Sequence, residues 1–174
     1  MVAWFSLLVW LGWSTAAHAA VPLQLRPGGQ TLDAWPAITL LADDTLTRSA
    51  QDMLERLEQF EAPANLNGSL GVRDKHAVWL RVPLELSSTP GSPWAINLGY
   101  SSLQEVDIYL TSEGRVLQQA MLGYLRPPDI ATLSNRVPAM LLNMQPGQRY
   151  DVLIRVRTLG PMILPISVTE LPHG

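Results

Sequence analysis

Apolar and polar residues alternate strictly along most of the chain after Gly71. The alternating runs, separated by Gly, Pro or Asn residues, cover residues 78–86, 94–100, 106–110, 116–117, 138–144, 150–156 and 162–168. A side-chain period of two is typical of a β-strand with one buried face. Six or seven short strands of this kind, with no βαβ rhythm and no internal repeat, predict an antiparallel β-sandwich.

The apolar spacing becomes helical only over residues 47–60. Apolar residues there recur three or four positions apart, and polar side chains fill the gaps, which predicts one amphipathic helix. Its start is marked either by Ser49, with Asp52 three positions later, or by Thr47. We expect this helix to cover an edge or an end of a sheet.

The N-terminal residues predict a secretory signal peptide. Residues 2–13 are almost wholly apolar, and Ala17-His18-Ala19 fits the A-x-A cleavage pattern, although the segment has no Lys or Arg before the apolar run. That run is short for a membrane span of about 20 residues, so cleavage is favoured over an uncleaved anchor. The expected organisation is a signal peptide over 1–19, a Pro- and Gly-rich lead over 20–35 with a short strand near 23–25, and the sandwich over 36–171.

The composition excludes several function classes. The formal net charge is −3 and only 16% of the residues are charged, whereas a nucleic-acid-binding domain needs a clustered basic face. Cysteine is absent, which excludes disulfides, thiolate nucleophiles, Cys-based zinc sites and iron–sulfur clusters. The three His residues leave little for a metal site. We therefore predict no nucleic-acid partner, no metal and no cofactor.

The sequence contains no recognisable catalytic motif. A P-loop, a G-x-G-x-x-G turn, a G-x-S-x-G elbow and an H-E-x-x-H pair are all missing. We therefore predict that the protein is not an enzyme. Carboxylate pairs that hydrolyse sugars have no fixed spacing in sequence, so a small glycoside-acting enzyme stays open as an alternative.

Chemistry-bearing side chains occupy the polar positions of several predicted strands. If those strands form one sheet, its outer face gathers aromatic, guanidinium, carboxylate and amide groups. Such a set suits a polar ligand such as a sugar, because aromatic rings offer a flat apolar surface and the polar groups hydrogen-bond hydroxyls. The positions concerned are Trp79, Arg81, Asn97, Glu105, Asp107, Tyr109, Asn143, Arg155 and Arg157.

A structural role is the alternative for the same residues. Arg–carboxylate pairs across strands support sheets without any ligand, and a large side chain such as Trp79 often anchors packing. Arg136, in a loop before a strand, either pins that loop or clamps a ligand. The candidate ligand-binding residues are Trp79, Arg81, Asp107, Tyr109, Arg136 and Arg155.

Several segments recur together in one order along the chain. They are Leu40–Asp44, the Trp79-Leu80-Arg81 strand within Ala77–Val82, Trp94–Tyr100, Leu103–Tyr109, Arg136, Pro146–Tyr150 and Val152–Val156. This order resembles the type 2 extracellular domain of bacterial seven-transmembrane receptors with diverse intracellular signalling modules (7TMR-DISM). The resemblance covers about residues 36–170.

This resemblance implies a periplasmic jelly-roll sandwich, similar to carbohydrate-binding modules, that senses a small ligand such as a carbohydrate. It further implies seven transmembrane helices and a cytoplasmic output module, such as a diguanylate cyclase or a histidine kinase. Trp79 and Arg81 match the family's W-L-R strand, and Arg136 matches its loop arginine. The expected partners are the ligand, a membrane-embedded receptor portion and a second copy of the chain in a homodimer.

The chain ends at Gly174, near the point where a first transmembrane helix is expected. We therefore expect a non-catalytic periplasmic sensor domain that is membrane-associated through a further C-terminal part. The alternative is a stand-alone exported carbohydrate-binding or adhesion module.

Overall fold

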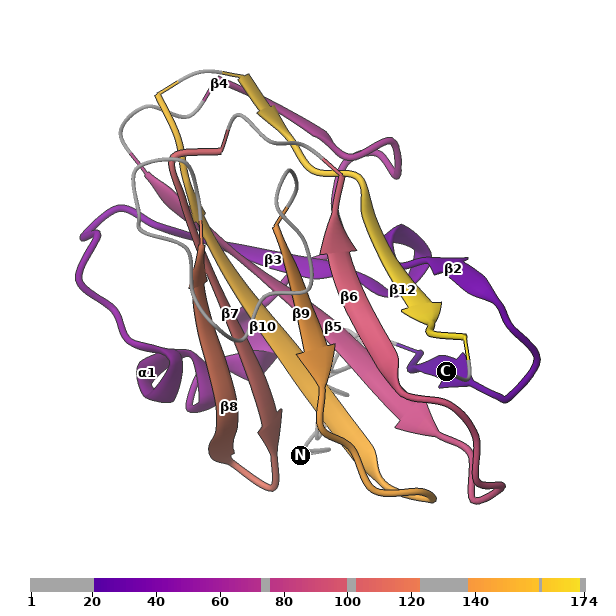
Figure 1. The fold of residues 1–174 in the computed structure, drawn as a ribbon. Coiled ribbons are helices and arrows are strands. Elements are labelled where there is room, and N and C mark those ends of the chain that lie inside the picture. Colours follow the sequence, from indigo (N-terminus) through magenta and orange to yellow (C-terminus); the bar gives the residue numbers. More distant parts are fainter. Residues whose placement is uncertain (1–20, 73–75, 100–102, 123–137, 160, 173–174) are drawn as a thin grey trace, which may run out of the picture.

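The computed structural model describes residues 21–72, 76–99, 103–122, 138–159 and 161–172. In these residues strands dominate, and two sheets form the layers of a sandwich (Figure 1). The prediction of a mostly β, antiparallel sandwich is confirmed, with one parallel pair and with more strands than the alternation alone indicated.

The larger sheet runs from β1 (Leu23–Leu25) through β5 (Ala77–Leu86), β10 (Arg149–Arg157) and β7 (Glu105–Ser112) to β8 (Arg115–Leu122). The sixth strand, β3 (Thr39–Asp43), also pairs with β5, along the half of β5 that β1 leaves free. β1 lies parallel to β5, and every other pairing in this sheet is antiparallel.

The smaller sheet has the order β2 (Thr31–Asp33), β12 (Ile166–Glu170), β6 (Trp94–Leu98) and β9 (Ala139–Leu142). A separate two-stranded ribbon joins β4 (Ser69–Val72) to β11 (Pro161–Ile163). The run expected as one strand over 162–168 is therefore two strands. The break falls at Leu164, whose N–H donates to the carbonyl of Gly68 (2.8 Å) and whose carbonyl accepts the indole N–H of Trp35 (2.6 Å).

The apolar faces of the two sheets meet in one core. Val78, Leu80 and Val82 of β5 lie in it with Ile96 of β6 and Val168 of β12, all without solvent exposure. Burying an aliphatic side chain of this size stabilises the fold by roughly 1.5–3 kcal/mol. The apolar positions of the strict alternation in the sequence are thus the residues on the strand faces that have no contact with water.

The lead over 20–35 is built into the sandwich. Its predicted short strand is β1, whose Leu25 is fully buried, and β2 follows in the other sheet. A 3-10 turn, η1 (Trp35–Ala37), then leads into β3. The segment therefore contributes to both layers of the sandwich.

The helix predicted over 47–60 is shorter and divided in two. α1 covers Ala50–Leu54, and a 3-10 turn, η2, covers Leu57–Gln59. The capping signal at Ser49 is confirmed. Ser49 Oγ accepts the N–H of Asp52 (3.1 Å), and the Asp52 carboxylate accepts the N–H of Ser49 (2.8 Å). The helix ends where Arg56 leaves helical geometry (φ −127°, ψ 23°) and its N–H bonds back three residues to Met53.

A buried carboxylate that the sequence analysis did not single out closes one end of the sandwich. Glu170, the last residue of β12, is 7% exposed. It accepts backbone N–H groups from Gly28 (2.8 Å), Gly29 and Ser92 (3.3 Å). Because hydrogen bonds to an ionised carboxylate are strong, Glu170 fastens the N-terminal lead and the β5–β6 loop to the end of β12.

Candidate functional site

Five of the six predicted ligand residues share the outer face of the larger sheet. In one row across the strands Arg155 pairs with Trp79 on one side and with Asp107 on the other. In the next row Leu153 lies between Arg81 and Tyr109. The shared face is therefore as predicted. The sixth residue, Arg136, lies outside the described residues.

The helix covers the aromatic part of this face. Trp79 has no solvent exposure and packs with Met53, Phe60 and Leu153 in a second apolar cluster, separate from the main core. Its ring stacks on that of Tyr109, with a centroid distance of 5.8 Å and an angle of 24° between the planes. The helix was expected to cover an edge or an end of a sheet. It packs on the outer face over Trp79, and it also contacts β8, the edge strand of this sheet.

Two buried polar atoms on neighbouring strands have no hydrogen-bond partner. The indole Nε1 of Trp79 is buried and makes no hydrogen bond in the structure, and the hydroxyl of Thr39 on the neighbouring strand β3 is in the same situation. A buried unbonded N–H reduces stability. The favourable contribution of Trp79 therefore comes from the packing of its ring.

Arg155 is the centre of an ion-pair group on the same face. Its Nη1 lies 3.3 Å from Glu105 and 3.5 Å from Asp107, and its Nη2 donates to the carbonyl of Leu46 (3.4 Å). The side chains of Arg155 and Asp107 are only 11% and 5% exposed. Pairs this buried are costly to break, because the remaining charge is left without a counter-ion. Arg155 thus links β7, β10 and the loop that precedes α1.

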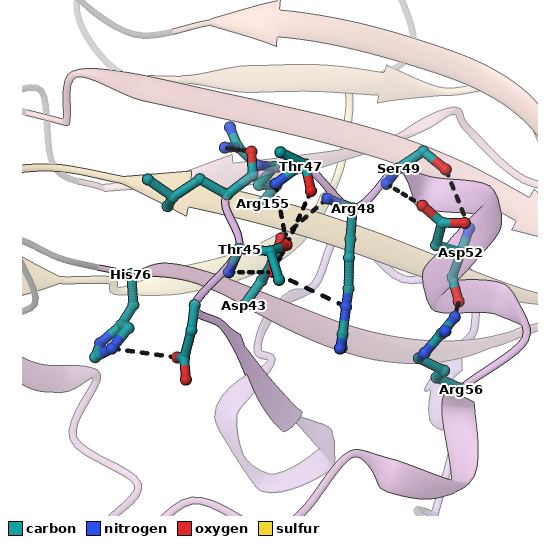
Figure 2. A network of polar contacts seen from close by, with 11 residues as sticks. Asp43, Thr45, Thr47, Arg48, Ser49, Asp52, Arg56, His76 and Arg155 are labelled. Atoms are coloured by element: carbon teal, nitrogen blue, oxygen red, sulfur yellow. Dashed lines mark hydrogen bonds and ion pairs between the residues drawn. The ribbon is translucent and has the colours of Figure 1, made fainter.

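Figure 2 shows how that loop is held above the sheet. Asp43, at the end of β3, accepts the backbone and hydroxyl groups of Thr45 (3.0 and 2.6 Å) and the N–H of Arg48 (3.2 Å). Burial by itself raises the pKa of Asp43, but the hydrogen bonds from Thr45 and Arg48 outweigh burial and hold this pKa below its ordinary value of 3.8. The ionised carboxylate therefore fixes the turn that delivers α1 to the outer face.

Arg81 has a different environment on the same face. Its guanidinium forms a bidentate ion pair with Asp151, with Nε–Oδ1 at 2.9 Å and Nη2–Oδ2 at 3.3 Å. Both side chains keep about a quarter of their surface in solvent, 25% and 23%. A paired guanidinium and carboxylate that remain partly exposed to solvent can still form hydrogen bonds to a ligand.

An open cleft of about 780 Å³ lies beside this pair. Residues of β5, of the β7–β8 turn, of β10 and of the lead before β1 line it, among them Arg81, Asp151, Arg149, Gln148, Glu113 and Pro22. A smaller cavity of about 340 Å³, lined mainly by Pro, Leu and Met side chains, adjoins the turn before β10. The larger cleft therefore holds more of the polar chemistry.

The sequence analysis missed Asp151 and Arg149. Both lie at the polar positions of β10 that alternate with Tyr150 and Val152, in phase with Arg155, so the rule that selected Arg155 also finds them. Two other expected members of the face do not belong to it. Asn97 lies in β6 and Asn143 directly follows β9, and both of these strands belong to the smaller sheet, in the layer opposite β5, β7 and β10.

The described part of the chain holds no group of three or more His, Asp or Glu residues arranged to bind a metal ion. Within the same residues, no helix has the length and apolar character needed to cross a membrane.

Comparison with solved structures finds a bacterial enzyme. The matches include β-glucuronidase from Ruminococcus gnavus in complex with D-glucuronic acid (12% identity, TM-score 0.46) and in complex with uronic deoxynojirimycin (11% identity, TM-score 0.44). Each alignment covers 88% of this chain but only 31% of the enzyme. Comparison with curated proteins gives no match.

Comparison with protein families gives a match over nearly the whole sandwich. The family described as 7TMR-DISM extracellular 2 matches residues 36–170. This confirms the resemblance drawn from the sequence, and it makes the sandwich a periplasmic sensor domain of the receptor type. The chain therefore belongs to the 7TMR-DISM extracellular 2 family.

Proposed function

We propose that this chain is a non-catalytic ligand-sensing domain, and that a small carbohydrate binds in the cleft beside Arg81 and Asp151. The observation that carries the proposal is a solvent-accessible pair of Arg81 and Asp151 next to a cleft of about 780 Å³ on the outer face of the larger sheet. Concave sites with a few convergent polar groups are the usual places for small ligands. Of the residues predicted from the sequence, this assigns ligand contact to Arg81.

The chemistry of the cleft suits a sugar. Asp151 and Glu113 offer acceptors for hydroxyl protons, and Arg149 offers donors from a side chain that is 75% exposed. Pro22 and Pro83 add apolar surface of the kind that contacts the C–H face of a sugar ring. A ligand that binds both the β10 side and the lead side of the cleft would tie the N-terminal segment to the centre of the sheet.

The proposal extends to the assembly in which the domain works. By family, we propose that the sandwich acts with a membrane-embedded receptor portion and a cytoplasmic output such as a diguanylate cyclase or a histidine kinase. A ligand biases such an assembly only through a difference in affinity between its two states. Reading the DNA downstream of the Gly174 codon tests this part: seven apolar segments in frame or in a neighbouring gene support it, and their absence favours a free carbohydrate-binding module.

The ligand site is tested by calorimetric titration of the periplasmically expressed chain with mono- and oligosaccharides. For a sugar that binds, we expect Arg149→Ala to lower the affinity about tenfold, which corresponds to about 1.4 kcal/mol. Arg26→Ala is the matched control, because Arg26 is also exposed but does not line the cleft. Fold stability is followed in parallel by thermal unfolding.

Tyr109→Ala separates the cleft from the other predicted site. Tyr109 lies on the same face but not in the lining of the cleft, so the cleft predicts unchanged affinity for this variant. A loss of binding in Tyr109→Ala with none in Arg149→Ala would move the site to the helix-covered region. No binding by any sugar in the panel would overturn the proposed ligand class.

A further inference from the structure

The charged side chains that line the cleft form ion pairs, with one exception. Arg81 is paired with Asp151, with Nε–Oδ1 at 2.9 Å. Arg149 also lines the cleft, and its Nε lies 3.2 Å from the carboxylate of Glu85, which is not part of the lining. Both guanidinium groups therefore have their charge balanced within the protein.

The exception is Glu113, which lines the cleft from the β7–β8 turn. Among the described residues, no Arg, Lys or His side chain lies within ion-pair distance of its carboxylate. Arg115, the next charged residue along the turn, is not in the lining. The lining and the Glu85 partner together hold two guanidinium groups and three carboxylates, so one negative charge is in excess and it lies on Glu113.

The backbone of this turn is one that glutamate rarely occupies. Glu113 and Gly114 have φ values of 51° and 73°, so both central residues of the two-residue hairpin turn are left-handed. Asn, Asp and Gly are preferred there, because a longer side chain has no local hydrogen bond to offset the strain. A strained residue whose side chain lines a site is a pointer to a function for that side chain, and Glu113 is such a residue.

Two hydrogen bonds hold the turn against its surroundings. Ser112 Oγ donates to the carbonyl of Arg149 on β10 (2.9 Å), and the Gln51 side chain of α1 donates to the carbonyl of Gly114 (3.3 Å). The turn is thus tied to the wall of the cleft and to the helix that covers the neighbouring region. The backbone of Glu113 is therefore positioned in advance, which lowers the entropic cost of a contact with a ligand.

We propose that the ligand of the cleft is an amino sugar whose ammonium group pairs with the carboxylate of Glu113. This inference rests on the proposed function and names the class of carbohydrate within it. The ammonium group supplies the positive charge that the lining lacks, and the hydroxyl groups of the same ring bond to Arg149 and Asp151. A uronic acid would bring a second carboxylate close to Glu113, where like charges repel, while both guanidinium groups are already paired.

Calorimetric titration of the periplasmically expressed chain tests the charge on a nearly constant ring. The probes are D-glucosamine, N-acetyl-D-glucosamine and D-glucose, with their linear disaccharides, and D-glucuronic acid, all at a slightly acidic pH that keeps the amine protonated. We expect the amino sugar to bind about five- to tenfold more tightly than its acetylated and neutral counterparts, and D-glucuronic acid to bind most weakly. Added salt should reduce this preference, because it screens the ion pair and not the hydroxyl contacts.

The outcomes of this titration separate the inference from the proposed function. A neutral sugar or the uronic acid that binds as tightly as the amino sugar would overturn the inference and leave a carbohydrate site in the cleft. No binding by any sugar would overturn the proposed ligand class, and the inference with it.

Substitutions at Glu113 separate its charge from its place in the fold. Glu113→Gln keeps the shape of the side chain and should abolish the preference for D-glucosamine over N-acetyl-D-glucosamine. Glu58→Gln is the matched control, because Glu58 is also exposed but does not line the cleft, and it should leave the preference unchanged. A preference that survives in Glu113→Gln, or that falls equally in Glu58→Gln, would overturn the inference.

Glu113→Gly adds a readout that a purely structural role would move in the other direction. Glycine occupies a positive φ without strain, so this variant should unfold at the same or a higher temperature than the unaltered chain although its preference for the amino sugar is lost. A clearly lower unfolding temperature would mean that Glu113 serves the turn and not a ligand.

Discussion

The outer face of the larger sheet has two regions built from the same kinds of side chain but with opposite exposure. Under α1 and η2, Trp79 and Asp107 are almost completely removed from water and Arg155 pairs with two carboxylates. Beyond the helix, Arg81 and Asp151 pair while keeping about a quarter of their surface in solvent. Arginines and aspartates thus serve the fold in one region and stay accessible to a ligand in the other.

The helix, and not the residue types, decides between the two roles. The segment from α1 to Phe60, the residue directly after η2, covers Trp79 with Ala50, Met53 and Phe60. Its position depends on the turn that Asp43 fixes and on the Arg155 contact with the carbonyl of Leu46. Substitutions in the covered region should therefore reduce stability strongly, and substitutions in the cleft should reduce it little.

The largest effect is expected for Trp79→Ala. Removing a fully buried Trp side chain leaves a cavity between β5 and the helix, so the free energy of unfolding should fall by about 3–5 kcal/mol. Trp79→Phe keeps an aromatic ring in contact with Tyr109 and removes an indole N–H that has no partner, so its loss should be smaller, about 1–2 kcal/mol. Urea unfolding of the three chains measures both differences. Near-equal stability of Trp79→Ala and the unaltered chain would show that α1 does not cover Trp79 in solution.

Arg155→Met is expected to have the next largest effect. Methionine keeps the aliphatic stem but leaves the 5% exposed carboxylate of Asp107 without its guanidinium partner, which should cost about 2–3 kcal/mol of stability. Arg81→Met is the counterpart in the open region. It breaks a more solvated pair, and we expect a loss of no more than about 1 kcal/mol. If the two substitutions destabilise equally in thermal unfolding, the distinction between the covered and open regions fails.

The pattern of side chains was enough to predict which residues of β5, β7 and β10 face away from the core, because alternation fixes the facing of each residue within a strand. It also predicted the cap at Ser49, since capping is a local interaction. Which strands become neighbours is a long-range outcome, so Asn97 was assigned to the wrong sheet. The covering of Trp79 and the cleft beside Asp151 depend on how α1 packs against residues distant in sequence, and periodicity holds no information on that packing.

Asp43→Asn is expected to have a smaller effect than Arg155→Met, and it is the substitution with a pH signature. Asparagine keeps an acceptor for Thr45, but its amide group would face the N–H of Arg48 with a second donor, so about 1–2 kcal/mol of stability should be lost at neutral pH. The pKa of Asp43 in the folded chain lies below its ordinary value of 3.8. The unfolded chain therefore binds this proton first as the pH falls, and the contribution of the carboxylate is complete above pH 3.8 and lost below it.

Comparing the two chains at two pH values isolates this contribution from the other carboxylates, which both chains share. The difference in urea unfolding free energy between the unaltered chain and Asp43→Asn should be full at pH 7 and clearly smaller at a pH below 3.8. Because Asp43 fixes the turn before α1, the loss at pH 7 should be accompanied by increased exposure of Trp79, measured as quenching of its fluorescence in a chain whose other Trp residues are replaced by Phe. A difference that stays constant with pH would mean that Asp43 acts by shape alone, and an unquenched Trp79 would mean that the segment over Trp79 is held without this turn.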